Sequence, residues 1–186
     1  MGIALANEFA RRGAEVTLIL GPSSLRPREE VKVLPVMTAE EMLRVAEDNI
    51  GEADIAIFAA AVADYRPLHS SDEKLKREGK GDLQLELVRN PDIAATLGSW
   101  KRPNQYFVGF ALESNAGFEE AKRKMAQKNL NAIVLNSLLD KGAGFACETN
   151  KVTLFDREGG IEAYELKSKE AVARDIVDFI ARRIAL

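Results

Sequence analysis

The chain has 186 residues, 46% of them hydrophobic, which suits one domain with a large apolar core and argues against disorder. Its net charge of -3 argues against a protein that binds nucleic acid by neutralising many phosphates. One cysteine and one histidine exclude an internal disulfide and leave no cluster with the spacing of a zinc site. Because it has neither an apolar run of about 18 residues nor a signal-peptide pattern, we expect a cytoplasmic chain that does not enter a membrane.

The first predicted elements are a helix and a strand. Apolar side chains recur at helical spacing over residues 1–12, and Arg11-Arg12-Gly13 supplies a cationic last turn with a glycine stop. Residues 14–20 form an apolar run typical of the second strand of a β-α-β unit. Because this helix is not preceded by a strand, we expect the first strand to be missing, although the pattern alone equally allows translation to begin at Met1.

A short strand at residues 31–36 and a capped helix follow. Thr38 and Glu41 have the spacing of a capping box, in which each side chain bonds the backbone amide of the other residue. The buried stripe of this helix is predicted to contain Met42, Val45, Ala46 and Ile50. Residues 53–61 then form an unbroken apolar run, which is the pattern of a strand buried on both faces.

This buried strand ends where we expect a polar ligand. Small residues, Asp64 and a proline follow it, and ligands of open α/β sheets collect beyond the carboxyl ends of the strands. Asp64 is either a ligand for a ribose hydroxyl or nucleotide-bound Mg²⁺, or a turn-forming residue. Residues 62–82 form a polar connection that is long for a compact domain, and such loops are usually functional or mobile. Lys74, with Lys76 and Arg77 nearby, therefore either binds phosphates or is simply solvated, and a charge run in a loop slightly favours the solvated interpretation.

The second half of the chain continues the alternation of strands and helices. Residues 83–88 have the pattern of a half-exposed strand, and we expect Asn90 to cap a short helix whose first position is Pro91. Strands are then predicted at residues 106–112, 132–136, 151–155 and 161–166, and helices at residues 116–129 and from Ser168 onward. Gly159-Gly160 indicates a hairpin. The sequence therefore predicts an α/β fold with a mainly parallel sheet, helices on both faces and a C-terminal antiparallel hairpin.

Several side chains have both a functional and an ordinary interpretation. Lys124 and Lys128 lie four residues apart on one helix face, where like charges repel by a few tenths of a kcal/mol unless an anion lies between them. Phe110 either offers its ring to a base or belongs to the core, and its spacing favours the core. Cys147 has no neighbouring base or second cysteine, so a passive thiol is favoured, and His69 is expected to face solvent.

Six motifs occur in order along the chain. They are Arg11-Arg12-Gly13-Ala14-Glu15-Val16-Thr17-Leu18 with Gly21-Pro22, Ala60-Ala61-Val62-Ala63-Asp64-Tyr65-Arg66-Pro67, Glu73-Lys74-Leu75-Lys76, Asn90-Pro91-Asp92-Ile93, Gly109-Phe110-Ala111 and Lys128-Asn129-Leu130. This combination closely resembles phosphopantothenoylcysteine synthetase, the phosphopantothenate-cysteine ligase of coenzyme A biosynthesis. In bacteria this domain is usually the C-terminal half of a bifunctional protein, so a flavin decarboxylase half, fused or separate, is an expected partner.

The resemblance implies a fold, a reaction and a set of partners. It implies a Rossmann-like domain over residues 1–186 that forms a homodimer and uses CTP, with ATP as an alternative, together with Mg²⁺. The carboxylate of 4'-phosphopantothenate is expected to attack the α-phosphate, which gives an acyl-cytidylate and pyrophosphate, and the cysteine amine then displaces CMP. No FMN is expected in this half, and no nucleic acid.

The resemblance also assigns site residues. Lys74 is the expected catalytic residue, because a fixed cation stabilises charge that develops on the phosphates. Asp64 is expected to contact the nucleotide or its Mg²⁺. The other expected nucleotide-binding residues are Phe58, Ala59, Ala60, Pro91, Asp92, Ile93, Ala94, Phe110, Lys124 and Lys128. The family also has an upstream strand, a glycine-rich loop and an Asn-x-Ser-Ser-Gly-Lys-Met-Gly segment, of which only Met1-Gly2 would remain, so we expect part of the site to be missing.

Two rival functions are open at this stage. One is a non-catalytic module that binds a nucleotide or mediates dimerisation. The other is an NAD(P)-dependent Rossmann reductase, which predicts a Gly-x-Gly-x-x-Gly motif after the first strand. That strand is not in the sequence, and no tyrosine and lysine occur at the Tyr-x-x-x-Lys spacing of such reductases.

Overall fold

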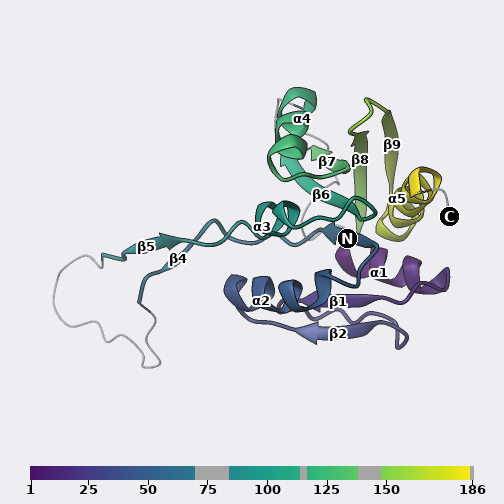
Figure 1. Cartoon of the computed structure of the whole chain (residues 1–186). Helices are drawn as coiled ribbons and strands as arrows, with labels where there is room; N and C mark the ends of the chain where they lie inside the picture. Colours follow the sequence, from purple (N-terminus) through teal and green to yellow (C-terminus); the bar gives the residue numbers. More distant parts are fainter. Residues whose placement is uncertain (70–83, 114–116, 138–147, 185–186) are drawn as a thin grey trace.

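The computed structural model describes residues 1–69, 84–113, 117–137 and 148–184 (Figure 1). The helices in these ranges are α1 (Gly2–Arg11), α2 (Ala39–Ile50), α3 (Ile93–Ser99), α4 (Gly117–Gln127) and α5 (Lys169–Ile184). The strands are β1 (Thr17–Leu20), β2 (Lys32–Pro35), β3 (Ile55–Phe58), β4 (Tyr65–Pro67), β5 (Leu87–Arg89), β6 (Tyr106–Glu113), β7 (Ala132–Ser137), β8 (Thr149–Asp156) and β9 (Ile161–Ser168). The strand expected at residues 83–88 corresponds to β5, which begins only at Leu87, because residues 84–86 lie outside any strand.

The central sheet has the strand order β3-β6-β7-β8-β9. Strands β3, β6 and β7 are parallel, with Ile55 opposite Tyr106, whereas β8 and β9 are antiparallel to their neighbours. The β8–β9 hairpin turns through Gly159, whose φ of 93° is a left-handed conformation that favours glycine. This arrangement confirms the predicted α/β fold with parallel strands followed by an antiparallel hairpin.

Two apolar clusters place helices on both faces of this sheet. One cluster joins the sheet to α1 and α5, and it contains Val172, Ile176, Phe179 and Ile180, as predicted for the last helix. The other joins the sheet to α2, α3 and α4. Thr38 and Glu41 form the predicted capping box at the start of α2, with the Glu41 amide 3.1 Å from Thr38 Oγ1. No described helix is both long and apolar enough to cross a membrane.

A second, parallel sheet of β1 and β2 shares this core without joining the first sheet. Ile19 of β1 packs in the same apolar cluster as Ala56 and Phe58 of β3. Among the described strands, β1 pairs only with β2 and β3 only with β6. Both β1 and β3 are therefore edge strands within the described part of the chain.

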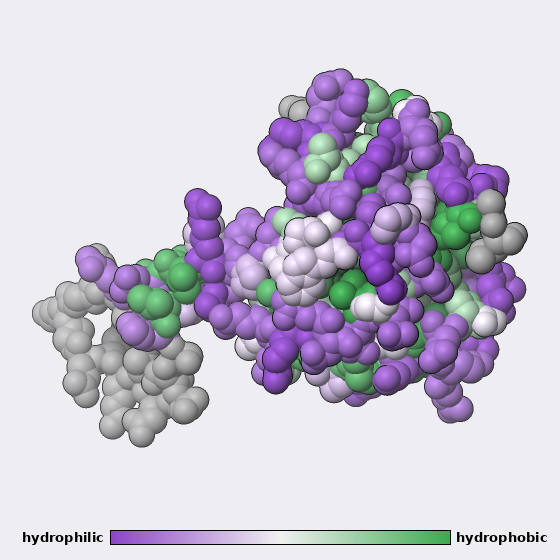
Figure 2. Space-filling model, viewed as in Figure 1, coloured by the Kyte–Doolittle hydropathy of each residue, from purple (hydrophilic) through white to green (hydrophobic). Residues whose placement is uncertain are grey.

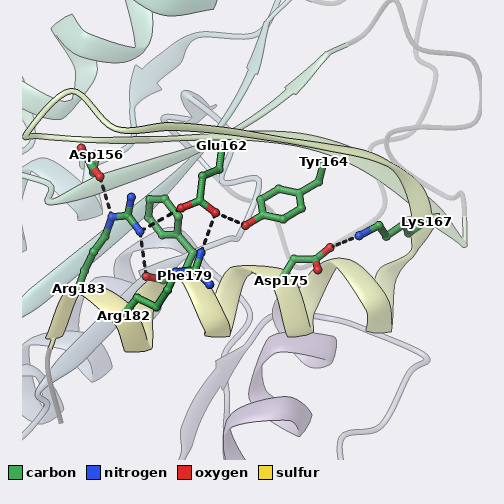
Figure 3. Close-up of polar contacts among 8 residues, drawn as sticks. All are labelled: Asp156, Glu162, Tyr164, Lys167, Asp175, Phe179, Arg182 and Arg183. Atoms are coloured by element: carbon green, nitrogen blue, oxygen red, sulfur yellow. Dashed lines mark hydrogen bonds and ion pairs between the residues drawn. The ribbon is translucent and has the colours of Figure 1, made fainter.

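A polar network fastens the C-terminal hairpin to α5 (Figure 3). Asp156, at the end of β8, is buried and accepts hydrogen bonds from Arg183 Nε and the Gly160 amide, both at 2.6 Å. The Arg183 guanidinium also lies 3.4 Å from the centre of the Phe179 ring. Burial alone would raise the pKa of Asp156, but the hydrogen bond from Arg183 holds that pKa below its usual value.

We predict that Arg183→Met lowers the free energy of unfolding by about 3 kcal/mol, because it leaves the buried Asp156 carboxylate without its charged partner. Arg182→Met is the matched control. Arg182 binds Glu162 at 2.7 Å, but its side chain is 53% exposed, so its loss should cost about 1 kcal/mol or less. Urea denaturation of both variants measures the difference, and equal losses would contradict the assigned role of the Arg183–Asp156 pair.

Candidate functional site

The carboxyl end of β3 lies against the first turn of α1. Phe58, the last residue of β3, is half-buried, and its ring makes an edge contact with Phe107 at a centroid distance of 5.6 Å. Ala59 follows, and its Cβ is 3.8 Å from the point that a Cβ on Gly2 would occupy. Ala60 is exposed. Phe58 therefore contributes to the core, while the two alanines form a small-residue surface beside the start of α1.

Asn90 holds together two segments that are far apart in sequence. Its side-chain amide donates to the Ala63 carbonyl at 2.8 Å, and its backbone amide donates to the Asp64 carbonyl at 2.8 Å. Arg66 adds a second link, because its guanidinium donates to Asn90 Oδ1 at 3.3 Å and to Glu40 of α2 at 2.6 Å. The exposed Asp64 is thereby placed next to the Asn90-Pro91 segment.

The start of α3 differs from the sequence prediction. Asn90 does not cap this helix and Pro91 does not occupy its first position; the cap is Asp92, whose carboxylate accepts from the Ala95 amide at 3.1 Å. The side chain of Asn90 is already bonded to the Ala63 carbonyl, and a carboxylate is a favourable cap because it also interacts with the helix dipole. Ile93 then begins the helix and is buried.

The structure brings Asp92 and Lys128 together from positions 36 residues apart. The ammonium of Lys128 lies 3.1 Å from Asp92 Oδ1 and 3.0 Å from Oδ2. Lys124, one turn earlier, has its ammonium 3.7 Å from a Glu120 oxygen. Because both lysines have carboxylate partners, the repulsion between them is not evidence for a bound anion.

The sheet separates Phe110 from this ion pair. Phe107 and Ala111 of β6 belong to the cluster beneath α3 and α4, whereas Phe110 packs against the cluster of α1 and α5. Phe110 is half-buried, and Pro91 and Ala94 are half-buried near Asp92. Lys74, Lys76, Arg77 and Cys147 lie outside the described residues.

The described residues contain no group of three or more histidine, cysteine, aspartate or glutamate side chains able to hold a metal ion. Asp64 is nevertheless an exposed carboxylate. A Mg²⁺ ion that takes most of its ligands from phosphates and water needs only one or two such groups from the protein. The donor set around Asp64 therefore fits a metal that arrives with a triphosphate and does not fit a resident metal centre.

Sequence reasoning missed two residues that shape this region. Arg66 belongs to a recognised motif, but its bridge to Glu40 joins positions 26 residues apart that no local pattern connects. Asn129 follows α4 with a φ of 50°, a left-handed conformation. An asparagine after a predicted helix is a known signal for such an ending, so this feature was open to prediction.

The comparisons with known proteins agree with the motifs. The family model of the DNA/pantothenate metabolism flavoprotein C-terminal domain matches residues 1–184. The bifunctional coenzyme A biosynthesis protein CoaBC of Escherichia coli is 40% identical over 185 residues, covering 98% of this chain and 45% of that protein. A protein of an unknown prokaryotic organism, named cysteine/cysteine sulfinic acid decarboxylase, is 51% identical over 95% of this chain and 49% of its own length. The chain thus spans about half the length of these curated relatives.

Solved structures give the same result. The crystal structure of the C-terminal domain of a CoaBC protein has a TM-score of 0.82 and 33% identity, over 99% of this chain and 82% of that one. A Cab2 mutant in complex with phosphopantothenate-cysteine has a TM-score of 0.68 over 99% of this chain and 78% of its own, and its 16% identity establishes a shared fold alone. Because the family model covers nearly the whole chain, the protein belongs to the DNA/pantothenate metabolism flavoprotein C-terminal domain family, as its motifs predicted.

Proposed function

We propose that this chain is the domain of a phosphopantothenate-cysteine ligase that activates a carboxylate with a nucleoside triphosphate. The observation that carries the proposal is the Asp92–Lys128 contact, which joins two of the motifs expected to bind the nucleotide. Asn90 places the Ala63-Asp64 segment of a third motif beside them. The relation to CoaBC, a bifunctional protein of coenzyme A biosynthesis, supports the same reaction, and the Cab2 complex with phosphopantothenate-cysteine shares the fold.

The proposed reaction has two steps. A carboxylate oxygen of 4'-phosphopantothenate attacks the α-phosphorus of CTP, or of ATP, and the bond to the β-phosphate oxygen breaks, which releases pyrophosphate. The cysteine amine then attacks the acyl carbon, loses a proton and displaces CMP, forming the amide. Negative charge builds up on the phosphates in the first step, so fixed cations at the site lower its barrier.

The described residues have different proposed roles in nucleotide binding. Lys128 and Lys124 supply positive charge, and Asp92 holds the ammonium of Lys128 in place. Ala59 and Ala60 offer small side chains to the nucleotide, and Pro91 and Ala94 offer half-buried ones, whereas Ile93 is buried in the core. Phe58 and Phe110 enter the proposal through the family resemblance, and both rings also pack against the core. Lys74 is proposed as the catalytic cation on the same resemblance.

Mg²⁺ is proposed to arrive with the triphosphate. When bound, it neutralises charge on the phosphate oxygens. Asp64 is the residue that would hold it, because it is exposed and its backbone carbonyl accepts a hydrogen bond from the Asn90 amide.

We also propose a homodimer, with an exposed arm as its contact. The arm consists of residues 65–69 and 84–89, whose strands β4 and β5 pair with each other and project from the body of the domain (Figure 1). Apolar side chains gather on it (Figure 2), and those of Tyr65, Leu68, Leu85 and Leu87 are 44–61% exposed. A two-stranded hairpin is only marginally stable in water by itself. Packing against the arm of a second copy would bury its apolar side chains.

The first strand that the family resemblance implies stays a prediction. The edge strands β1 and β3 share an apolar cluster, and a parallel strand between them would join the two sheets. We propose this position for it.

A second candidate function rests on the relative named cysteine/cysteine sulfinic acid decarboxylase, which is 51% identical to this chain. In that case the chain is a non-catalytic module of a protein whose chemistry lies in another domain. Pyrophosphate formation separates the candidates, since only the ligase releases it. An NAD(P)-dependent reductase is the least supported alternative, because the family relation gives it no support.

For the arm, we predict that Leu87→Asp converts a dimer into a monomer, because it places a charge in the proposed apolar contact. Leu25→Asp is the control, since Leu25 is 67% exposed but lies in the loop between β1 and β2. Sedimentation velocity gives the oligomeric state. A Leu87→Asp protein that remains dimeric would remove the arm from the interface.

For Lys128, we predict that Lys128→Met weakens CTP binding about tenfold, because one charge-assisted contact to phosphate is lost. Lys122→Met serves as the control, because Lys122 is exposed on α4, the helix that ends just before Lys128, and lies near the Phe118 ring. Isothermal titration with CTP, ATP and NADPH measures the affinities. Tight NADPH binding without binding of either triphosphate would overturn the ligase proposal.

For Lys74, we predict that Lys74→Gln keeps the fold but lowers pyrophosphate release about a hundredfold with CTP, Mg²⁺ and phosphopantothenate. The exposed Lys32→Gln is expected to leave the rate unchanged. Thermal melting of the same samples checks folding. Full activity of Lys74→Gln would reject the assigned role, and no pyrophosphate from the folded, unmutated full-length protein would favour the non-catalytic module.

A further inference from the structure

The last turn of α3 lies in direct contact with the end of α4. Gly98 is buried, and a Cβ at this position would collide with the Lys128 carbonyl oxygen and lie 2.9 Å from the carbonyl carbon. Both atoms belong to the backbone, so they have no flexible side chain that could swing away. The absence of a side chain at Gly98 therefore sets how close the backbone of Lys128 comes to α3.

Asn129 also holds the end of α4 against α3. Its φ of 50° turns the chain sharply after α4, and its side-chain amide donates to the Gly98 carbonyl at 2.8 Å. Its own oxygen atoms accept from Arg157, at 2.9 Å, and from Lys101, at 2.8 Å. The ends of α3 and α4 and the β8–β9 turn are thus tied to one residue.

Lys128 contacts both ends of α3, one through its backbone and the other through its side chain. Its backbone touches α3 at Gly98, while its ammonium reaches Asp92, the cap at the opposite end of the same helix. Six residues of helix rise about 9 Å, which is more than a lysine side chain covers alone, so the contact with Asp92 depends on how closely the Lys128 backbone lies beside the helix. A displacement of that backbone at Gly98 therefore shifts the base of the side chain that reaches Asp92.

We propose that Gly98 and Asn129 are positioning residues that fix the ammonium of Lys128 for contact with the phosphates of the nucleotide. This inference rests on the proposed function, in which Lys128 binds the triphosphate. A glycine inside a helix weakens it relative to alanine, so its presence in α3 calls for a steric reason, and the contact with the Lys128 backbone supplies one.

A double-mutant cycle tests this proposal on the full-length protein, with CTP and Mg²⁺ as the probe. Gly98→Ala is expected to weaken CTP binding about tenfold, because a group displaced by an ångström or less loses most of its contact. In the Lys128→Met background the same substitution should change the affinity less than twofold, since no ammonium is left to misplace. Gly51→Ala is the control, because a Cβ at that glycine would meet no atom within 4 Å beyond its neighbours in the chain.

A second variant covers the case in which Gly98→Ala does not fold. Asn129→Gly keeps the left-handed backbone but removes the side-chain bonds to Gly98 and Arg157, and we expect CTP binding about threefold weaker, again only when Lys128 is present.

The outcomes separate the two proposals. If Lys128→Met leaves CTP affinity unchanged, the nucleotide role of Lys128 fails. If Lys128→Met weakens binding but the Gly98 and Asn129 variants act equally in both backgrounds, or not at all, the positioning role alone is overturned. Loss of the Gly98 or Asn129 effect in the Lys128→Met background supports it, because a general loss of stability would persist there.

Discussion

Burial of β6 on both faces is the constraint on which the rest of the structure depends. Phe107 and Val108, adjacent in this strand, are completely buried and belong to opposite clusters. A strand covered on both faces requires helices on both sides, as is usual for strands that pair in parallel, and β6 pairs in parallel with both β3 and β7. Gly109 leaves room for Leu130, since a Cβ there would lie 2.5 Å from a Leu130 methyl carbon. The Gly109-Phe110-Ala111 and Lys128-Asn129-Leu130 motifs therefore pack directly against each other.

The candidate site is assembled around this buried sheet from helix ends. The motif containing Asp92 begins α3, and the motif containing Lys128 follows α4. Neither lies in a central strand, yet both elements are fixed to β6 by buried side chains such as Leu97 and Met125. The polar residues can therefore remain partly exposed while their backbones are held rigidly. This explains how a site with few buried charges keeps a defined geometry.

Sequence patterns predicted the fold better than the site. Apolar runs, the Thr38–Glu41 capping box and the Gly159 turn are local signals, and local signals suffice for elements and their order. The helix start at Asp92 was missed because Asn90 is the better cap by position, and only the distant Ala63 carbonyl shows that its side chain is occupied. The Asp92–Lys128 pair spans 36 residues, a distance at which spacing carries no information. Only the family resemblance grouped these residues, and it gave no geometry.

The Asp92–Lys128 pair has a consequence for how the site meets an anion. The lysine already has a counterion that belongs to the protein, so a phosphate must share the ammonium with Asp92 or replace it. Binding is then an exchange of one anionic partner for another, and the gain in free energy is the difference between the two. A ligand with several charges close together is favoured in such an exchange, whereas a single carboxylate from solution gains little. Under the proposed function, the ion pair is therefore a threshold that favours ligands with a high density of charge.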